Sequence, residues 1–382
     1  MTNEQRFSLD DLHRVYVEVD ARDVHAQWNE REDIVVQGNG VDAFLEAGEL
    51  FISASHDRQF NKERIEIELP RQLLNFAVKA ERGDVALDRP QGKLDLRVDS
   101  GDVAIADGTG TLSLSSGKGD LKINTFAGNV TANSGSGDKL FSDVNGDVTV
   151  RSGRGETKML RGSGAAEVMG ASGDVIINDR DTSRLNVTNA SGDVVIRGGR
   201  LGGTVIETAS GDIDCNVPLT IATYDFTAAS GDIALSVQRD LPLRVDAATT
   251  RGSIESDLPL VAIQQRGPRN PHGKRVVGST SDAAERAEIT MRTTSGDIRL
   301  KWSNDSAPSA HPAKPILNEP IPVPAPAPET PRNDDPVPHD LFDDDRRRVI
   351  LNALADGSLS VEEASRLLDA MDATSGSLNG GR

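Results

Sequence analysis

The stretch from Gly101 to Asp138, GDVAIADGTGTLSLSSGKGDLKINTFAGNVTANSGSGD, decides the fold of this 382-residue chain. Glycine recurs in it every nine residues, at Gly101, Gly110, Gly119, Gly128 and Gly137. The second and fourth residues after a glycine are mostly apolar, as Val103 and Ile105 are. Apolar residues that alternate with polar ones between glycine turns predict short β-strands with one face toward a core.

A second period of eighteen residues is superimposed on the first, because an acidic residue follows every other glycine. These acids are Asp84, Asp102, Asp120, Asp138, Glu156 and Asp174. Later copies of the Gly-Asp pair, at slightly longer intervals, end in Asp193, Asp212, Asp232 and Asp297. The structural unit is therefore two strands and two turns, and it repeats along most of the chain.

Two architectures can carry such a repeat, a β-solenoid and an antiparallel meander. A solenoid must keep one register, because every coil lies on the coil before it, whereas a meander tolerates strands of variable length. We therefore predict an all-β fold, a β-solenoid of about 18-residue coils in which equivalent residues stack ~4.8 Å apart. Only 3% of the residues are aromatic, which fits the narrow space between two facing sheets.

The remaining segments differ from the repeat in composition. Residues 1–80 lack the register but hold strand-like runs, and a cap is needed because a solenoid end exposes unpaired backbone groups. The predicted organisation is a β-rich N-terminal cap at 1–80, the solenoid at 81–302 with a polar loop insertion at 264–288, a Pro-rich disordered linker at 303–340, a helical hairpin at 341–373 and a disordered tail at 374–382.

The predicted hairpin carries a capping box, Ser360 with Glu363, and apolar residues at helical spacing. A hairpin of ~30 residues is too small to form a core of its own. We expect its apolar face to bind a protein partner or to self-associate, and the candidate contact residues are Ile350, Leu354, Leu367, Leu368 and Met371.

Composition excludes several classes of protein. A net charge of −18, from 60 acidic and 42 basic residues, would repel the phosphates of a nucleic acid. Cys215 is the single cysteine, so no disulfide forms within the chain. No stretch approaches the ~18 apolar residues of a membrane span, and the first residues lack the pattern of a signal peptide. We therefore expect a cytoplasmic protein by default, with the cell surface open to unmarked export.

The recurring acids are weak candidates for a cation-binding ladder: Asp84, Asp102, Asp120, Asp138, Asp174, Asp193, Asp212 and Asp232. Ca²⁺ takes carboxylate and carbonyl oxygens, but calcium-binding β-rolls have Gly-x-Asp, whereas Gly and Asp are adjacent here. We therefore favour a structural role, in which each carboxylate accepts a hydrogen bond from a nearby turn amide. The sequence predicts no firm metal site, no cofactor and no catalytic residue, since no convergent catalytic set or nucleotide-binding motif is present.

The repeated Ser-Gly-Asp-Val/Ile units, such as Ser172–Val175 and Ser191–Val194, resemble those of a bacterial putative-adhesin family of unknown function over residues 12–302. Residues 343–372 resemble the short helical-hairpin (SHOCT-like) domain often attached to it. The resemblance implies a β-solenoid with a non-enzymatic role, at the envelope or in envelope-stress signalling. Our leading hypothesis is a non-catalytic binding or scaffold protein. The alternatives are a self-assembling filament and a polysaccharide-active β-helix enzyme, which would need acids converging in a groove.

Overall fold

The computed structural model describes residues 4–9, 12–54, 64–260, 273–281 and 283–303, and these residues form strands and turns without a helix. No membrane-spanning helix therefore exists within these ranges. The predicted hairpin, with Ile350, Leu354, Leu367, Leu368 and Met371, lies outside the described residues, as do the predicted tail and the linker from residue 304 on.

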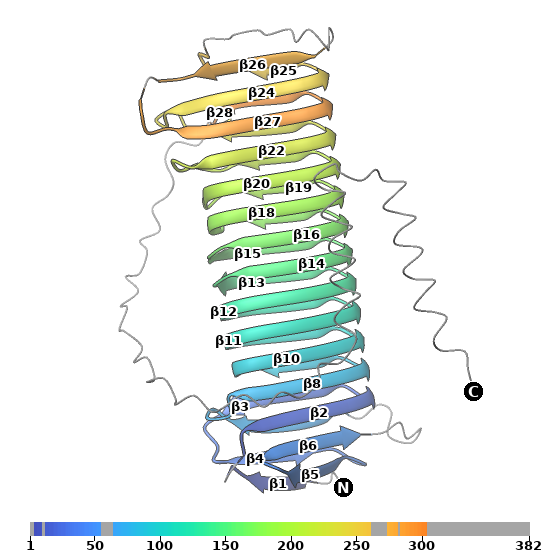
Figure 1. Ribbon diagram of the computed structural model, residues 1–382. Helices are drawn as coiled ribbons and strands as arrows, with labels where there is room; N and C mark the ends of the chain where they lie inside the picture. The colour runs from blue at the N-terminus through green and yellow to red at the C-terminus, as the bar shows by residue number, and fades with distance from the viewer. Residues whose placement is uncertain (1–3, 10–11, 55–63, 261–272, 282, 304–382) are drawn as a thin grey trace, which may run out of the picture. The chain divides into compact units, whose positions relative to one another are not determined.

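Consecutive eighteen-residue segments lie parallel on one another. Strands β10 (Gln91–Ser100), β11 (Val103–Lys118) and β12 (Leu121–Ser136) pair so that Leu94, Leu112 and Val130 are neighbours in one column. The predicted β-solenoid is confirmed, because each strand pairs with its equivalent one repeat away in the chain (Figure 1).

Each coil contributes one strand to each of two facing layers, and β11 and β12 run through both. Layer A, which precedes the Gly-Asp turn, contains β8 (Asn75–Arg82), β14 (Val148–Arg154), β16 (Ala166–Ser172), β18 (Asp181–Ser191), β20 (Arg200–Ser210) and β22 (Thr223–Ser230). Layer B, which follows that turn, contains β9 (Val85–Asp88), β13 (Lys139–Asn145), β15 (Thr157–Ser163), β17 (Val175–Asn178), β19 (Val194–Arg197), β21 (Ile213–Asn216) and β23 (Ile233–Val237).

A single core fills the space between the layers. Alternate residues of the strands in the coils point inward, so Leu94 and Leu96 of layer A face Val103 and Ile105 of layer B, all buried. The register also holds at Lys139, where the apolar pattern is interrupted, because this side chain points inward and is 1% exposed. Burial of Val, Ile and Leu in repeated columns supplies the main stabilisation of each coil.

The N-terminal end of the stack is built out of chain order. Its strands are β1 (Glu4–Ser8), β2 (Arg14–Ala21), β3 (Val24–Asn29), β4 (Asp33–Gln37), β5 (Asp42–Glu46), β6 (Glu49–Ala54) and β7 (Ile65–Pro70). The coil β2–β3 pairs with β8–β9 on one side and with β6–β7 on the other. The parallel stack thus extends into the predicted cap at 1–80, where coils that neighbour in space are too far apart in sequence to show a period.

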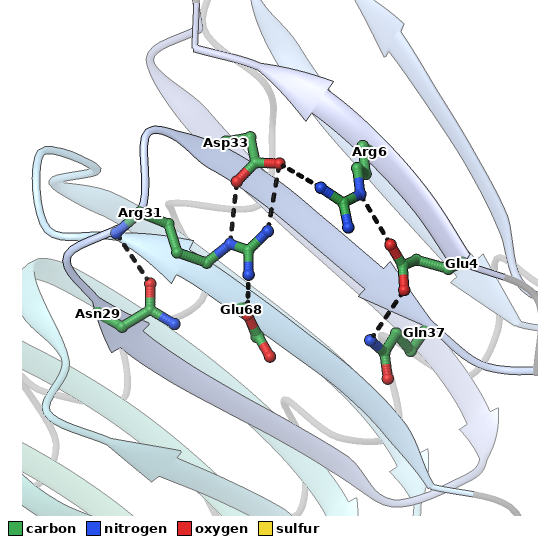
Figure 2. A network of polar contacts seen from close by, with 7 residues as sticks. All are labelled: Glu4, Arg6, Asn29, Arg31, Asp33, Gln37 and Glu68. Carbon is green, nitrogen blue, oxygen red and sulfur yellow. Dashed lines mark hydrogen bonds and ion pairs between the residues drawn. The ribbon is translucent and has the colours of Figure 1, made fainter.

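Antiparallel strands close this end. Strand β4 pairs with β7, β1 with β4, and β5 with β6. Figure 2 shows the polar network around β1, β4 and β7: Arg31 contacts Asp33 at 2.9 Å and Glu68 at 2.8 Å, while Arg6 contacts Glu4 at 2.7 Å. The Arg31 hydrogen bond holds the pKa of Asp33 below its ordinary value.

The C-terminal end has the same irregularity. Its strands are β24 (Leu243–Arg251), β25 (Ile254–Ser256), β26 (Lys274–Ser279), β27 (Ala287–Ser295) and β28 (Ile298–Trp302). Strand β27 pairs with both β22 and β24, so the last described coil in sequence lies inside the stack, between coil β22–β23 and strands β24 and β25, as the strand labelled β27 in Figure 1 shows.

The predicted polar loop at 264–288 needs a correction. Part of it is strand β26, which pairs antiparallel with β24, and its last two residues begin β27. Its polar composition reflects the position of β26 at the edge of layer A, where Lys274 and Arg275 are exposed.

Candidate functional site

The recurring aspartates form a hydrogen-bonded column along one edge of the stack, which we call the aspartate ladder. Asp84 Oδ1 accepts a hydrogen bond from the backbone N–H of Asp102 at 2.8 Å, and the contact repeats from coil to coil. The pairs that follow are Asp102–Asp120, Asp120–Asp138, Asp138–Glu156, Asp174–Asp193, Asp193–Asp212, Asp212–Asp232, Asp232–Asp297 and Asp297–Ser253. The structure therefore confirms the hydrogen-bonding role that the sequence favoured.

The ladder also extends below the repeat, because Asp23 accepts from the N–H of Asp84 at 2.9 Å. Glu156 is one methylene longer than aspartate, and its carboxylate pairs with Lys158 at 2.7 Å. At the other end the backbone and side chain of Ser253 lower the pKa of Asp297. Like charges so close together repel, and the amide contacts offset that repulsion.

Cation binding by the ladder remains a prediction. The described residues hold no group of three or more His, Cys, Asp or Glu side chains that could bind a metal ion. One oxygen of each laddered carboxylate is already taken by an amide, which leaves fewer oxygens than the six to eight that Ca²⁺ takes.

Glycine is required at the turn because the coils approach closely there. Gly119 has φ +130°, and a Cβ on it would lie 2.0 Å from the carbonyl oxygen of Gly101 in the neighbouring coil. The Arg82-Gly83-Asp84 tripeptide occupies the same kind of turn, with Gly83 at φ +117°. Its match to an integrin-binding motif thus follows from the repeat.

A groove of about 940 Å³ crosses the outer surface of layer A from β16 to β26. Small side chains two residues before the turn glycines, such as Ala209 and Ala229, form part of its lining. Charged and hydroxyl-bearing side chains also line it: Thr188, Glu207, Thr227, Arg292, Lys274 and Arg275. Sequence reasoning missed this groove. Its lining combines residues of β24, β26 and β27 with residues of earlier coils, and an irregular segment separates the two groups in sequence.

Three buried basic side chains, Arg22, Lys139 and Arg180, donate to backbone carbonyls, and the last two lie within the repeat. Nζ of Lys139 donates to the carbonyl oxygens of Gly137 at 2.7 Å and Arg154 at 2.9 Å and also contacts the Ser152 hydroxyl. Arg180, 2% exposed, donates to Val144 O at 2.7 Å. Burial lowers the pKa of Lys139 and of Arg180. They act as internal braces and do not line the groove.

Cys215 is fully buried in β21, as the alternation in sequence predicts. Burial raises the pKa of its thiol to about 12, so the thiolate, which is the reactive form, is scarce at neutral pH. Cys215 therefore serves as a small core residue.

Comparison with known proteins gives a family and distant structural matches. A family model described as Toastrack DUF4097 matches residues 60–301. A solved structure of a putative adhesin from Bacteroides fragilis is 10% identical, with 79% of this chain and 97% of that chain covered and a TM-score of 0.28. A putative cell adhesion protein from Clostridium sporogenes is 7% identical, with 79% and 99% covered and a TM-score of 0.15. No curated protein matches the chain.

Proposed function

Because the chain belongs to the Toastrack DUF4097 family, whose description states no activity, we propose a function from its surface. The protein is a non-catalytic adhesive module that holds an acidic polysaccharide in the groove of layer A. The observation that carries the proposal is the long groove with small residues in its lining and charged residues along it.

The chemistry of the groove supports a glycan as ligand. Parallel strands repeat every ~4.8 Å, so Thr188, Glu207 and Thr227 present hydrogen-bonding groups at the spacing of successive coils. Among the described lining residues, the three cations Lys274, Arg275 and Arg292 outnumber the one carboxylate, Glu207, which favours an anionic ligand. Arg275 is paired with Asp246 at 2.6 Å. We therefore expect the carboxylates of the ligand to form ion pairs mainly with Lys274 and Arg292.

The same lining supports binding without cleavage. Glycoside hydrolysis uses two carboxyl groups on either side of the scissile bond. Glu207 is the one carboxylate among the described residues that line the groove, and the laddered aspartates lie at the turns outside it. This arrangement disfavours the alternative of a polysaccharide-active enzyme.

Binding is tested with polygalacturonate as the acidic glycan and dextran as the neutral control, by calorimetry on the full chain. We expect polygalacturonate to bind and the Arg292→Glu variant to lose at least tenfold in affinity. Ala209→Trp, which fills the groove, should abolish binding, whereas Ala104→Trp, on exposed layer B, should not. No difference between the two tryptophan variants would contradict the proposal.

We further propose that the segment at 341–373 recruits a protein partner and that the module works at the bacterial envelope. Its support is the apolar pattern of the predicted hairpin and the family resemblance of the repeat. A pull-down with the full chain and with a chain ending at Ala310 tests the first part. Identical partner sets would refute it.

A further inference from the structure

We propose that copies of this chain stack end to end, with β5 of one copy pairing with β26 of the next. Each of these strands lies at an end of layer A and has a ladder partner on one side only among the described residues. An edge strand exposes backbone N–H and C=O groups that can pair with another chain. The N-terminal end of one copy would therefore contact the C-terminal end of the next copy.

The two edge strands run in the same direction and match in position. Asp42 lies opposite Ser53, and Arg275 lies opposite Ala248, in the same column of layer A. If the column continues from one copy into the next, β5 and β26 pair in parallel. Asp42, Ala43, Phe44, Leu45 and Glu46 then meet Arg275, Val276, Val277, Gly278 and Ser279 of the second copy in that order.

The side chains on the two edges are complementary. Strand β5 carries two acids, Asp42 and Glu46, and β26 carries two bases, Lys274 and Arg275, of which Arg275 also pairs with Asp246 of its own chain at 2.6 Å. Pairing between two N-terminal ends would bring acids together, and like charges directly opposite on neighbouring strands are destabilising. Charge therefore favours the head-to-tail arrangement over a symmetric one.

Among the residues that the structure describes, no strand covers the core column beyond β5. Leu45 pairs with the fully buried Leu50 and points to the same side of the layer, yet its side chain is 51% exposed. Exposed apolar residues on a free edge are the usual mark of an interface. In the stacked arrangement Leu45 meets Gly278, whose core side is covered by Leu260: a Cβ on Gly278 would lie 2.7 Å from the Cβ of Leu260. Leu45 would therefore pack against Leu260 of the second copy.

The numbers of strands by which layers A and B extend at the two ends are also complementary. Beyond coil β2–β3, layer A has β6 and β5, whereas layer B has β7, β4 and β1. Beyond coil β27–β28, layer A has β24 and β26, whereas layer B has β25 alone among the described residues. A joint between copies would therefore hold four strands in each layer, so neither layer is left with a gap.

The layer B side of the joint brings together one opposite-charge pair, one apolar pair and one like-charge pair. Strands β1 and β25 run in the direction of the coils, so they also pair in parallel across the joint. The register sets Arg6 beside Asp257 and Phe7 beside Leu258, and it also sets Glu4 beside Glu255. Arg6, which contacts Glu4 at 2.7 Å within its own chain, lies next to this like-charge pair. The Arg6 side chain is 62% exposed and therefore accessible to a second copy. A head-to-tail contact of this kind does not close on itself, so it builds filaments.

Blocking one end at a time tests the stacking. Leu45→Glu adds an acid to the N-terminal edge, and Val277→Glu adds an acid to the C-terminal edge opposite Phe44 and near Asp42. Val205→Glu is the matched control, since Val205 is 42% exposed in the middle of layer A. We expect sedimentation and electron microscopy to show concentration-dependent filaments for the natural chain and for Val205→Glu.

Each end-blocked variant alone should have the mass of one chain. Mixed in equal amounts, they should form a species of two chains and no longer one, because each variant keeps one free end. Filaments that survive both substitutions, a single-chain mass for the natural protein up to about millimolar concentration, or a closed two-chain species of Val277→Glu alone would overturn the proposal. Glycan binding is measured separately, so its failure leaves this result unaffected.

Discussion

Asp102 accepts a hydrogen bond through Oδ1 from the backbone N–H of Asp120 at 2.8 Å, and the same bond joins Asp120 to Asp138 eighteen residues later. Each carboxylate thus fixes the turn of the coil that follows it. Because coils contact only their neighbours, the stability of the stack is a sum of such local terms. This repetition makes single substitutions informative.

Replacing Asp120 by alanine removes the acceptor for the Asp138 amide. We expect the free energy of unfolding to fall by about 1 kcal/mol, the usual worth of one hydrogen bond. Asp120→Asn keeps an acceptor oxygen and should cost less. Denaturant titration measures both, with Asp99→Ala, an exposed acid outside the ladder, as control. Equal losses for Asp120→Ala and Asp99→Ala would contradict this role.

Gly119→Ala should be among the most destabilising surface substitutions. Its positive φ costs ~1–2 kcal/mol for an L-residue, and the new Cβ would in addition meet the Gly101 carbonyl oxygen at 2.0 Å. Gly203→Ala is the matched control, because the nearest atom to its added Cβ is 3.8 Å away. Thermal melting of the two variants should show a clear loss for Gly119→Ala alone.

The buried Lys139 predicts a pH dependence at the alkaline side. Burial lowers its folded pKa below the ordinary 10.5, so the charged form costs stability at neutral pH. That cost disappears as pH rises through the folded pKa toward 10.5. The natural chain should therefore gain stability relative to Lys139→Met over this range. Parallel pH dependences of unfolding in the two proteins would refute the assignment.

Asp297 predicts a pH dependence of stability on the acidic side. The Ser253 contacts lower its folded pKa below 3.8, so it contributes stability above that value, and the contribution is lost as pH falls through the folded pKa. Asp297→Asn has no such titration. Its stability deficit against the natural chain should be constant above pH ~5 and shrink in more acidic solution, as denaturant titration at each pH would show.

Calcium removal should leave the melting temperature unchanged. The laddered carboxylates are engaged by amides, and the described residues hold no three-ligand group. Thermal melting with excess Ca²⁺ and with chelator checks this expectation. A melting temperature that rises with Ca²⁺ and falls in Asp120→Asn would instead establish the cation ladder.

The central coils could be predicted because coils that neighbour in space also follow one another in sequence, so their period is visible there. Every turn glycine from Gly101 to Gly173 has a positive φ and faces the preceding coil, so steric need and sequence period coincide there. The aspartate ladder follows for the same reason. A residue that repeats every coil must meet its own copy.

The ends and the groove could not be predicted, because their neighbours are distant in sequence. Strand β2 pairs with β6 and β8, and no local period connects Val15 with Leu50 and Phe76. The positive φ of a non-glycine residue at the second turn of the coils was also missed. Arg89, Asp107, Thr125, Asp143, Arg161 and Asp179 all adopt φ between 53° and 58°, although their residue types share no pattern. The backbone geometry of the coil imposes this conformation on whatever residue stands there.

The tucked position of β27–β28 has a consequence for how the stack comes apart. A strand at the end of a solenoid has a hydrogen-bonded partner on one side only, so it separates more easily than an interior strand. Here β27 and β28, the last described strands in sequence, each pair with a strand on both sides. Removing either of them therefore breaks two sets of backbone hydrogen bonds at once. Force applied through residues beyond Trp302 would thus load an interior strand and not an end strand.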